Sequence, residues 1–145
     1  MKYTELTAEI SSNIKSIKEQ SPDLLKSFNA LSQVAMKDGV IDAKTKEFIA
    51  LAIGVAQRCD GCIGFHVRTL VKLGMTFEEL NEILGIAVYM GGGPSLMYAA
   101  NAVAAAIRAL KFLMASFSLK RNRTSTLIFA PSMLSCRNLT VLPQG

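Results

Sequence analysis

Apolar residues recur every three or four positions along most of this chain, a spacing that places them on one face of an α-helix. The first such set is Leu6, Ile10, Ile14 and Ile17, and no convincing strand alternation occurs before about Ala115. The chain has 145 residues, and 50% of them are hydrophobic, which suffices for a sizeable core. We therefore expect an all-α fold of about six helices.

Capping residues divide this pattern into separate helices. Ser21-Pro22 is typical of a helix start, because serine suits the N-cap and proline suits the first turn. Asp42 is expected to cap a third, largely apolar helix that ends at Ala56, and a fourth helix should run from about Gly61 to Leu73. Thr76 and Glu79 match a capping box, which predicts the start of a fifth helix.

A long uncharged stretch, Ile83 to Ile107, is long enough for a membrane span on length alone. Its middle is Gly91-Gly92-Gly93-Pro94, which interrupts a single helix. We therefore expect two shorter buried helices, and no membrane span. The nearby Tyr89, Met90, Met97 and Tyr98 are expected in the core or in a subunit interface, and Ala99 to Ala115 should form an alanine-rich sixth helix.

Charge and composition change after Ala115. The net charge is +5, but positive and negative residues nearly balance up to that point, whereas Lys120, Arg121, Arg123 and Arg137 follow without an acid. We expect a helical domain at residues 1–115 and a basic, weakly structured tail at 116–145. No basic cluster alternates with aromatic residues, so a nucleic-acid partner is not expected. The first residues contain early acids and no apolar run, so we expect no signal peptide and a cytoplasmic location.

The clearest chemical signal is a Cys-x-x-Cys sequence, Cys59-Asp60-Gly61-Cys62, followed by the chain's single histidine, His66. Such a pair in a chain without a signal peptide indicates a redox dithiol or part of a metal site. The start of a helix favours a thiolate, and His66, four residues after Cys62, can accept the thiol proton. Glu47, on the preceding helix, can orient His66 if the two helices pack together.

Two other interpretations of the motif remain open at this stage. Cys59, Cys62 and His66 could be three zinc ligands, although a structural zinc needs a fourth, and Cys136 in the tail is the remaining soft ligand. Alternatively, the two thiols could be buried and inert. The redox interpretation is preferred, so we expect no bound metal or cofactor.

The spacing of Glu47, Cys59, Cys62 and His66 resembles that of the alkylhydroperoxidase D-like branch of the carboxymuconolactone decarboxylase superfamily. The resemblance extends from about Phe28 to Ala106. It implies an all-α fold that assembles into homotrimers or homohexamers, and antioxidant reduction of small hydroperoxides by the cysteine pair. A dithiol reductant, such as a lipoylated protein, would recycle the pair.

By position, the resemblance makes Cys62 the thiolate that attacks the peroxide and Cys59 the resolving thiol. His66 and Glu47 become the proton relay. Some members carry a second histidine next to the second cysteine, where this chain has Gly61, so the relay is expected to be simpler here. A non-redox decarboxylase, in which His66 and Glu47 do acid–base work, and a redox-sensing module are the alternatives.

Overall fold

The structure, a computed structural model, describes residues 2–121 and is all-helical over that range, with five helices and no strand. They are α1 (Tyr3–Gln20), α2 (Pro22–Met36), α3 (Ala43–Ala56), α4 (Asp60–Lys72) and α5 (Phe77–Arg121). The expected all-α fold is confirmed. The predicted tail, apart from the end of α5, lies outside the described residues.

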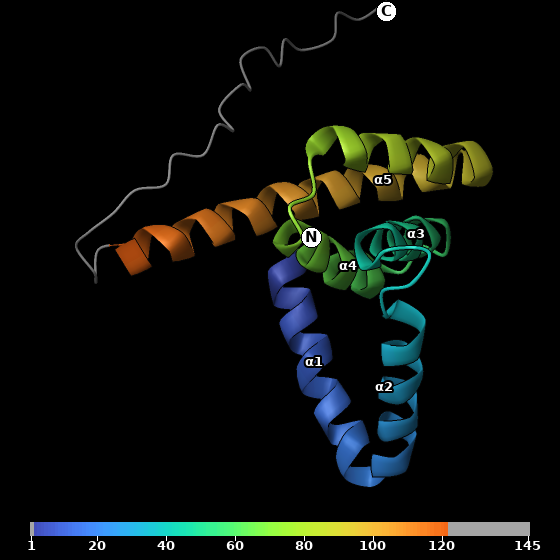
Figure 1. Ribbon diagram of the computed structural model, residues 1–145, viewed down its shortest axis with the longest axis vertical. Coiled ribbons are helices and arrows are strands. Elements are labelled where there is room, and N and C mark those ends of the chain that lie inside the picture. Colours follow the sequence, from blue (N-terminus) through green and yellow to red (C-terminus); the bar gives the residue numbers. More distant parts are fainter. Residues whose placement is uncertain (1, 122–145) are drawn as a thin grey trace, which may run out of the picture.

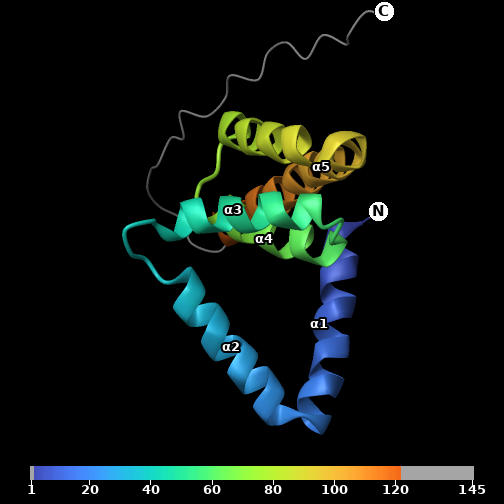
Figure 2. The same cartoon turned by 90° about the vertical axis from the view of Figure 1, so that its right-hand side faces the viewer.

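The body of the molecule consists of α3, α4 and the two segments of α5 (Figures 1 and 2). α5 changes direction at Gly92, whose φ of 66° and ψ of −156° are not helical. Its two segments therefore fold back on each other above α3 and α4. Fully buried side chains from these helices, among them Leu51, Ile63, Leu70 and Leu80, form the core between them.

The region after Gly92 differs from expectation in two ways. The helix resumes directly after the glycine rather than near Ala99, and it continues to Arg121, past the predicted domain end at Ala115. Ala99, Ala102, Ala105 and Ala106 are buried, as small residues at a close helix contact should be. The break at Gly92 confirms that the uncharged stretch forms two helical segments.

The expectation that this stretch is buried is only partly met. Tyr89, Met90 and Met97 are 86%, 75% and 60% exposed, so they are not core residues of the single chain. Phe77–Ser116 is the one helical stretch in the described part that is long and apolar enough to cross a membrane, a test that core helices of soluble proteins also pass.

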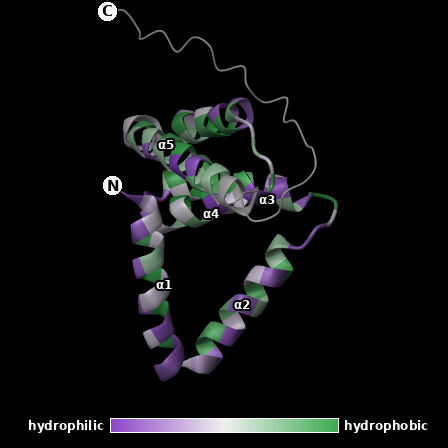
Figure 3. Cartoon of the chain, turned by 90° about the vertical axis from the view of Figure 1, so that its left-hand side faces the viewer, coloured by the Kyte–Doolittle hydropathy of each residue, from purple (hydrophilic) through white to green (hydrophobic). Residues whose placement is uncertain are grey.

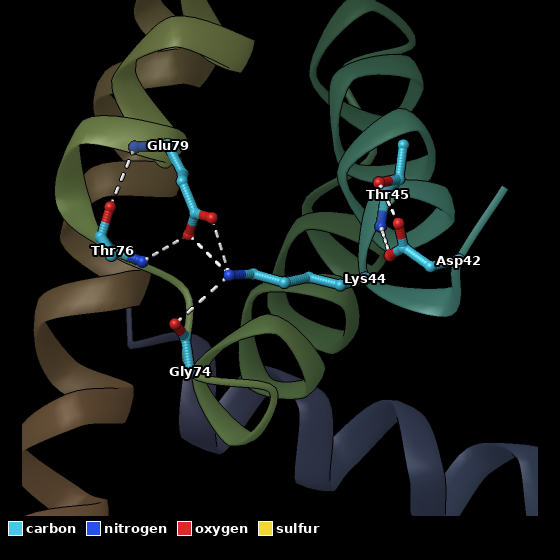
Figure 4. A network of polar contacts seen from close by, with 6 residues as sticks. All are labelled: Asp42, Lys44, Thr45, Gly74, Thr76 and Glu79. Carbon is cyan, nitrogen blue, oxygen red and sulfur yellow. Dashed lines mark hydrogen bonds and ion pairs between the residues drawn. The ribbon is translucent and has the colours of Figure 1, made fainter.

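Local capping sets the boundaries of α3 and α5 (Figure 4). The Asp42 carboxylate accepts a hydrogen bond from the Thr45 backbone N–H at 2.8 Å, as predicted. The Thr76 hydroxyl and the Glu79 carboxylate each accept the other's backbone N–H, at 3.1 and 2.8 Å, which confirms the capping box. Lys44 joins the two helices, because its Nζ lies 2.7 Å from a carboxylate oxygen of Glu79.

The first two helices form a hairpin that projects from the body, with α1 anchored on α4 (Figures 1 and 2). α2 begins at Pro22 as predicted, although Ser21 makes no side-chain capping bond. No residue of α2 is buried, and the hydrophobic residues that Figure 3 colours green along this helix include several that are mostly exposed. In the single chain, α2 therefore buries none of its hydrophobic residues.

Candidate active site

The cysteine motif is placed by the way in which α3 ends. The backbone N–H of Cys59 bonds to the carbonyl of Gly54 at 2.9 Å, and that of Arg58 bonds to Val55 at 3.1 Å. These two bonds form the Schellman motif, which requires a residue in the left-handed conformation between the last residue of the helix and the segment that follows it. Arg58 takes that conformation, with φ of 57°, although glycine usually occupies such a position. The chain therefore turns sharply from α3 into the motif.

Cys59 and Cys62 lie at the start of α4 and are joined by a disulfide, with Cα atoms 5.3 Å apart. Cys59 is the N-cap residue, and its sulfur accepts the backbone N–H of Cys62 at 3.2 Å. Backbone donors and the positive end of the helix dipole stabilise negative charge at this sulfur when the pair is reduced. The local geometry therefore allows the two cysteines to exist either as a disulfide or as a pair of thiols.

His66 and Glu47 form a hydrogen-bonded pair across α4 and α3. Nδ1 of His66 lies 2.6 Å from Oε2 of Glu47, so the two helices pack as the sequence argument required. The side chains are 29% and 13% exposed, so the histidine is partly accessible from the surface of the chain. Because Glu47 holds Nδ1, Nε2 is the ring nitrogen left to exchange a proton. His66 follows Cys62 by one turn on α4, so all four predicted residues lie along the α3–α4 interface or at the start of α4.

Gly54 allows this junction to close. A Cβ atom at Gly54 would lie 3.1 Å from the Cβ of Cys62, closer than ordinary packing permits. α3 therefore approaches the redox motif at a position without a side chain. The sequence alone does not reveal this role of Gly54, because a glycine inside a helix gives no sign of which neighbouring element it contacts.

The N-terminal helix covers the other side of the motif. The Tyr3 hydroxyl donates a hydrogen bond of 2.7 Å to the carboxylate of Asp60, which lies between the two cysteines. Burial and this carboxylate raise the pKa of Tyr3. Cβ atoms at Gly61 and Gly64 would meet Ile10 and Thr7 at 2.9 and 2.6 Å, so α1 packs directly on α4.

This packing gives a physical reason for the glycine at position 61, where the family that the sequence resembles has a histidine in some members. A side chain at Gly61 would displace Ile10, so in this chain α1 occupies the space that such a histidine would take. Sequence reasoning missed the role of α1, because Tyr3 and Asp60 are 57 residues apart and no local pattern links them.

Within residues 2–121, no three His, Cys, Asp or Glu side chains are grouped so that they could hold a metal ion. Cys136, the fourth ligand considered for a zinc site, lies outside the described residues. The arrangement around Cys62 therefore offers a dithiol and a proton-transfer pair rather than a recognisable metal cage.

Sequence comparisons match this chain to known proteins over most of its helical part. Residues 22–105 match the model of the carboxymuconolactone decarboxylase family. An uncharacterized protein of Cupriavidus necator is 38% identical over 101 residues, covering 70% of this chain and 88% of that protein. An uncharacterized protein encoded in the cox locus of Paracoccus denitrificans is 36% identical over 77 residues, covering 53% and 69%.

Two solved structures are also similar to this chain. A carboxymuconolactone decarboxylase family protein from Legionella pneumophila, in its apo form, is 52% identical with a TM-score of 0.73; the match covers 74% of this chain and 96% of that one. A family protein from Thermotoga maritima is 28% identical with a TM-score of 0.63, covering 83% and 98%.

Proposed function

This chain belongs to the carboxymuconolactone decarboxylase family, and from that membership we propose that it is a thiol-dependent peroxidase of the alkylhydroperoxidase D-like type. The observation that carries the proposal is the Cys59–Cys62 disulfide beside the hydrogen-bonded His66–Glu47 pair. The relative from Thermotoga maritima, for which an antioxidative role has been suggested, agrees with this choice.

In the first step, the thiolate of Cys62 attacks the terminal oxygen of a hydroperoxide. The O–O bond breaks, Cys62 becomes a sulfenic acid, and the departing alkoxide takes a proton to leave as an alcohol. His66 takes the thiol proton at Nε2 and then supplies it to the alkoxide. Glu47 holds Nδ1 and stabilises the charged imidazolium that exists between these two transfers.

In the second step, Cys59 resolves the sulfenic acid. Its thiolate attacks the sulfur of Cys62, the S–O bond breaks as the disulfide forms, and the departing hydroxide takes up the proton that Cys59 released and leaves as water. The backbone N–H that already points at the Cys59 sulfur stabilises the thiolate needed for this attack. A dithiol reductant, such as a lipoyl group on a partner protein, then restores both thiols by exchange and becomes a disulfide itself.

We further propose that the enzyme works as a homotrimer or homohexamer in the cytoplasm. The support for an assembly is α2, where Leu24, Phe28, Leu31 and Val34 are between 62% and 76% exposed. A continuous apolar face of this kind marks an interaction site on a protein. A second copy of the chain would bury it.

The test is intact-mass spectrometry after thiol alkylation, before and after one equivalent of cumene hydroperoxide. The chain has three cysteines, so alkylatable thiols should fall from three to one, with the loss mapped to Cys59 and Cys62 and reversed by dihydrolipoamide. Cys62→Ser should abolish the response, Cys59→Ser should stop at a trapped sulfenic acid, and Cys136→Ser is the control that should cycle normally. Full turnover by Cys59→Ser would contradict the resolving role.

A decarboxylase is the second candidate, favoured by the His66–Glu47 pair, which can do acid–base work without thiols. The same alkylation separates the two functions. A lactone decarboxylase should keep its activity after both motif cysteines are blocked, whereas a thiol peroxidase should lose all of it.

A further inference from the structure

A cavity of about 360 Å³ lies on the side of α4 that faces away from α3. It is bounded by the start of α1, by α4 and by the second segment of α5, three elements that meet near the N-terminus in Figure 1. Cys59, Cys62, His66 and Glu47 do not line it, so it is distinct from the candidate active site. Its volume lies within the range of small-molecule sites.

The cavity has one extended apolar wall on each of α4 and α5, and its polar lining residues come mainly from α1 and the edge of α4. Val67 and Val71 of α4 face Ala105, Ala109 and Leu113 of α5 across it. The two alanines leave the space open, because longer side chains on that face of α5 would fill it. A wall of this kind favours an aliphatic group over a polar one.

The charges at the cavity are all of one sign. Arg68 and Lys72 are four residues apart on α4, so they lie on the same helix face, and both line the cavity with exposed side chains. No Asp or Glu lines it. The ion pairs in the described part of the chain involve neither cation; the Arg68 guanidinium lies instead over the Phe65 ring, at 5.2 Å.

We propose that this cavity binds a medium-chain aliphatic carboxylate, with its chain between α4 and α5 and its carboxylate beside Arg68 and Lys72. Two unpaired cations at the edge of an apolar cavity complement a single anionic head on an apolar tail. Tyr3 and Gly64 also line the cavity and belong to the contact between α1 and the cysteine motif, so the ligand would touch that contact. The proposal does not depend on peroxidase activity.

The test is isothermal titration calorimetry of the full chain with decanoate and with decanol, which has the same chain length and no charge. Decanoate should bind with one site per chain and up to about 25-fold more tightly than decanol, since each of the two exposed ionic contacts contributes up to roughly 1 kcal/mol, a factor of about five. Arg68→Gln and Lys72→Gln should each weaken decanoate binding about fivefold and leave decanol binding unchanged. Lys15→Gln, which removes a charge away from the cavity, should match the unchanged protein.

A second variant tests the apolar part. Ala109→Phe should abolish binding of both ligands, with circular dichroism confirming that the helices remain. Equal affinity for decanoate and decanol, or equal weakening by Lys15→Gln, would overturn the carboxylate site. So would binding to phosphatidylglycerol vesicles without binding to decanoate. A change of oligomer mass in Ala109→Phe, with no ligand binding by the unchanged protein, would assign the cavity to a second copy of the chain.

Discussion

Gly54 and Gly85 are both helical glycines, but their surroundings differ. A Cβ atom at Gly54 meets Cys62 at 3.1 Å, whereas one at Gly85 meets nothing within 4 Å. We expect Gly54→Ala to lower the free energy of unfolding by about 1–3 kcal/mol, because α3 and α4 must separate slightly. Gly85→Ala should raise it by about 0.5–1 kcal/mol, since alanine is the better helix former. Urea unfolding measures both, and equal stabilisation by the two substitutions would contradict the close approach at Cys62.

Tyr3 is the residue that ties α1 to the cysteine motif through Asp60. We expect Tyr3→Phe to lower the free energy of unfolding by about 1–2 kcal/mol, because Asp60 loses its donor in a partly buried place. Burial and the Asp60 hydrogen bond raise the pKa of Tyr3 above its ordinary 10.0, so the neutral phenol is favoured in the folded chain. The stabilisation by the neutral phenol is complete below pH 10.0 and is lost as the pH rises further, so the free energy of unfolding should fall at alkaline pH. Tyr3→Phe removes the titrating group and should make this fall less steep.

The control for this change is Tyr89→Phe, which removes a hydroxyl from a side chain that is 86% exposed. It should alter stability by less than about 0.5 kcal/mol and leave the alkaline decline as it was. Matching pH profiles for Tyr3→Phe and the unchanged protein would show that the Tyr3–Asp60 bond does not stabilise the fold.

Among the elements, the start of α5 combines a capping box with the Lys44 contact from α3. Two hydrogen bonds lower the pKa of Glu79 below its ordinary 4.5. The bond from the Lys44 side chain has the larger effect, and the bond from the Thr76 backbone N–H has the smaller one. The stability that Glu79 contributes is therefore present above pH 4.5 and is lost as the pH falls through its lowered pKa. We expect Glu79→Gln to reduce the acid-induced loss of unfolding free energy, and Thr76→Ala to cost about 1 kcal/mol at neutral pH.

The adjacent Glu78 provides the matched comparison, since it is exposed and takes no part in the box. Glu78→Gln should leave the acid profile of unfolding unchanged. If Glu78→Gln and Glu79→Gln shift the profile equally, then net charge rather than the capping contact determines the acid sensitivity.

The same elements show how far the sequence predicts the fold. Asp42 and the Thr76–Glu79 box locate helix starts correctly, because such capping depends on residues three positions apart. The pairing of Glu47 with His66 could be stated only as a condition, because it requires α3 and α4 to pack side by side along their length. The contacts of Tyr3 with Asp60 and Ile10 with Gly61 could not, because they depend on where a distant helix docks.

At the scale of the whole molecule, the hairpin of α1 and α2 is the part that a single chain does not explain. The sequence predicts an apolar face on α2, and burial of that face would normally stabilise the helix. Instead, α2 has no buried residue and makes few contacts with α3. Such a helix is expected to fold against another copy of the chain, which would bury its hydrophobic residues.

The prediction at this scale concerns Phe28 and Leu31, which are 63% and 65% exposed on the apolar face of α2. The double substitution Phe28→Asp and Leu31→Asp should convert the oligomer to monomers, because each buried anchor at an interface contributes roughly 2 kcal/mol or more. Together the two substitutions would raise the dissociation constant about a thousandfold. Light scattering after size exclusion measures the mass. The control is Gln33→Asp, which lies on the opposite side of the helix and should leave the oligomer intact. An unchanged mass in the double variant would place the interface elsewhere. The exposed Tyr89 and Met90 of α5 would then be the next surface to vary.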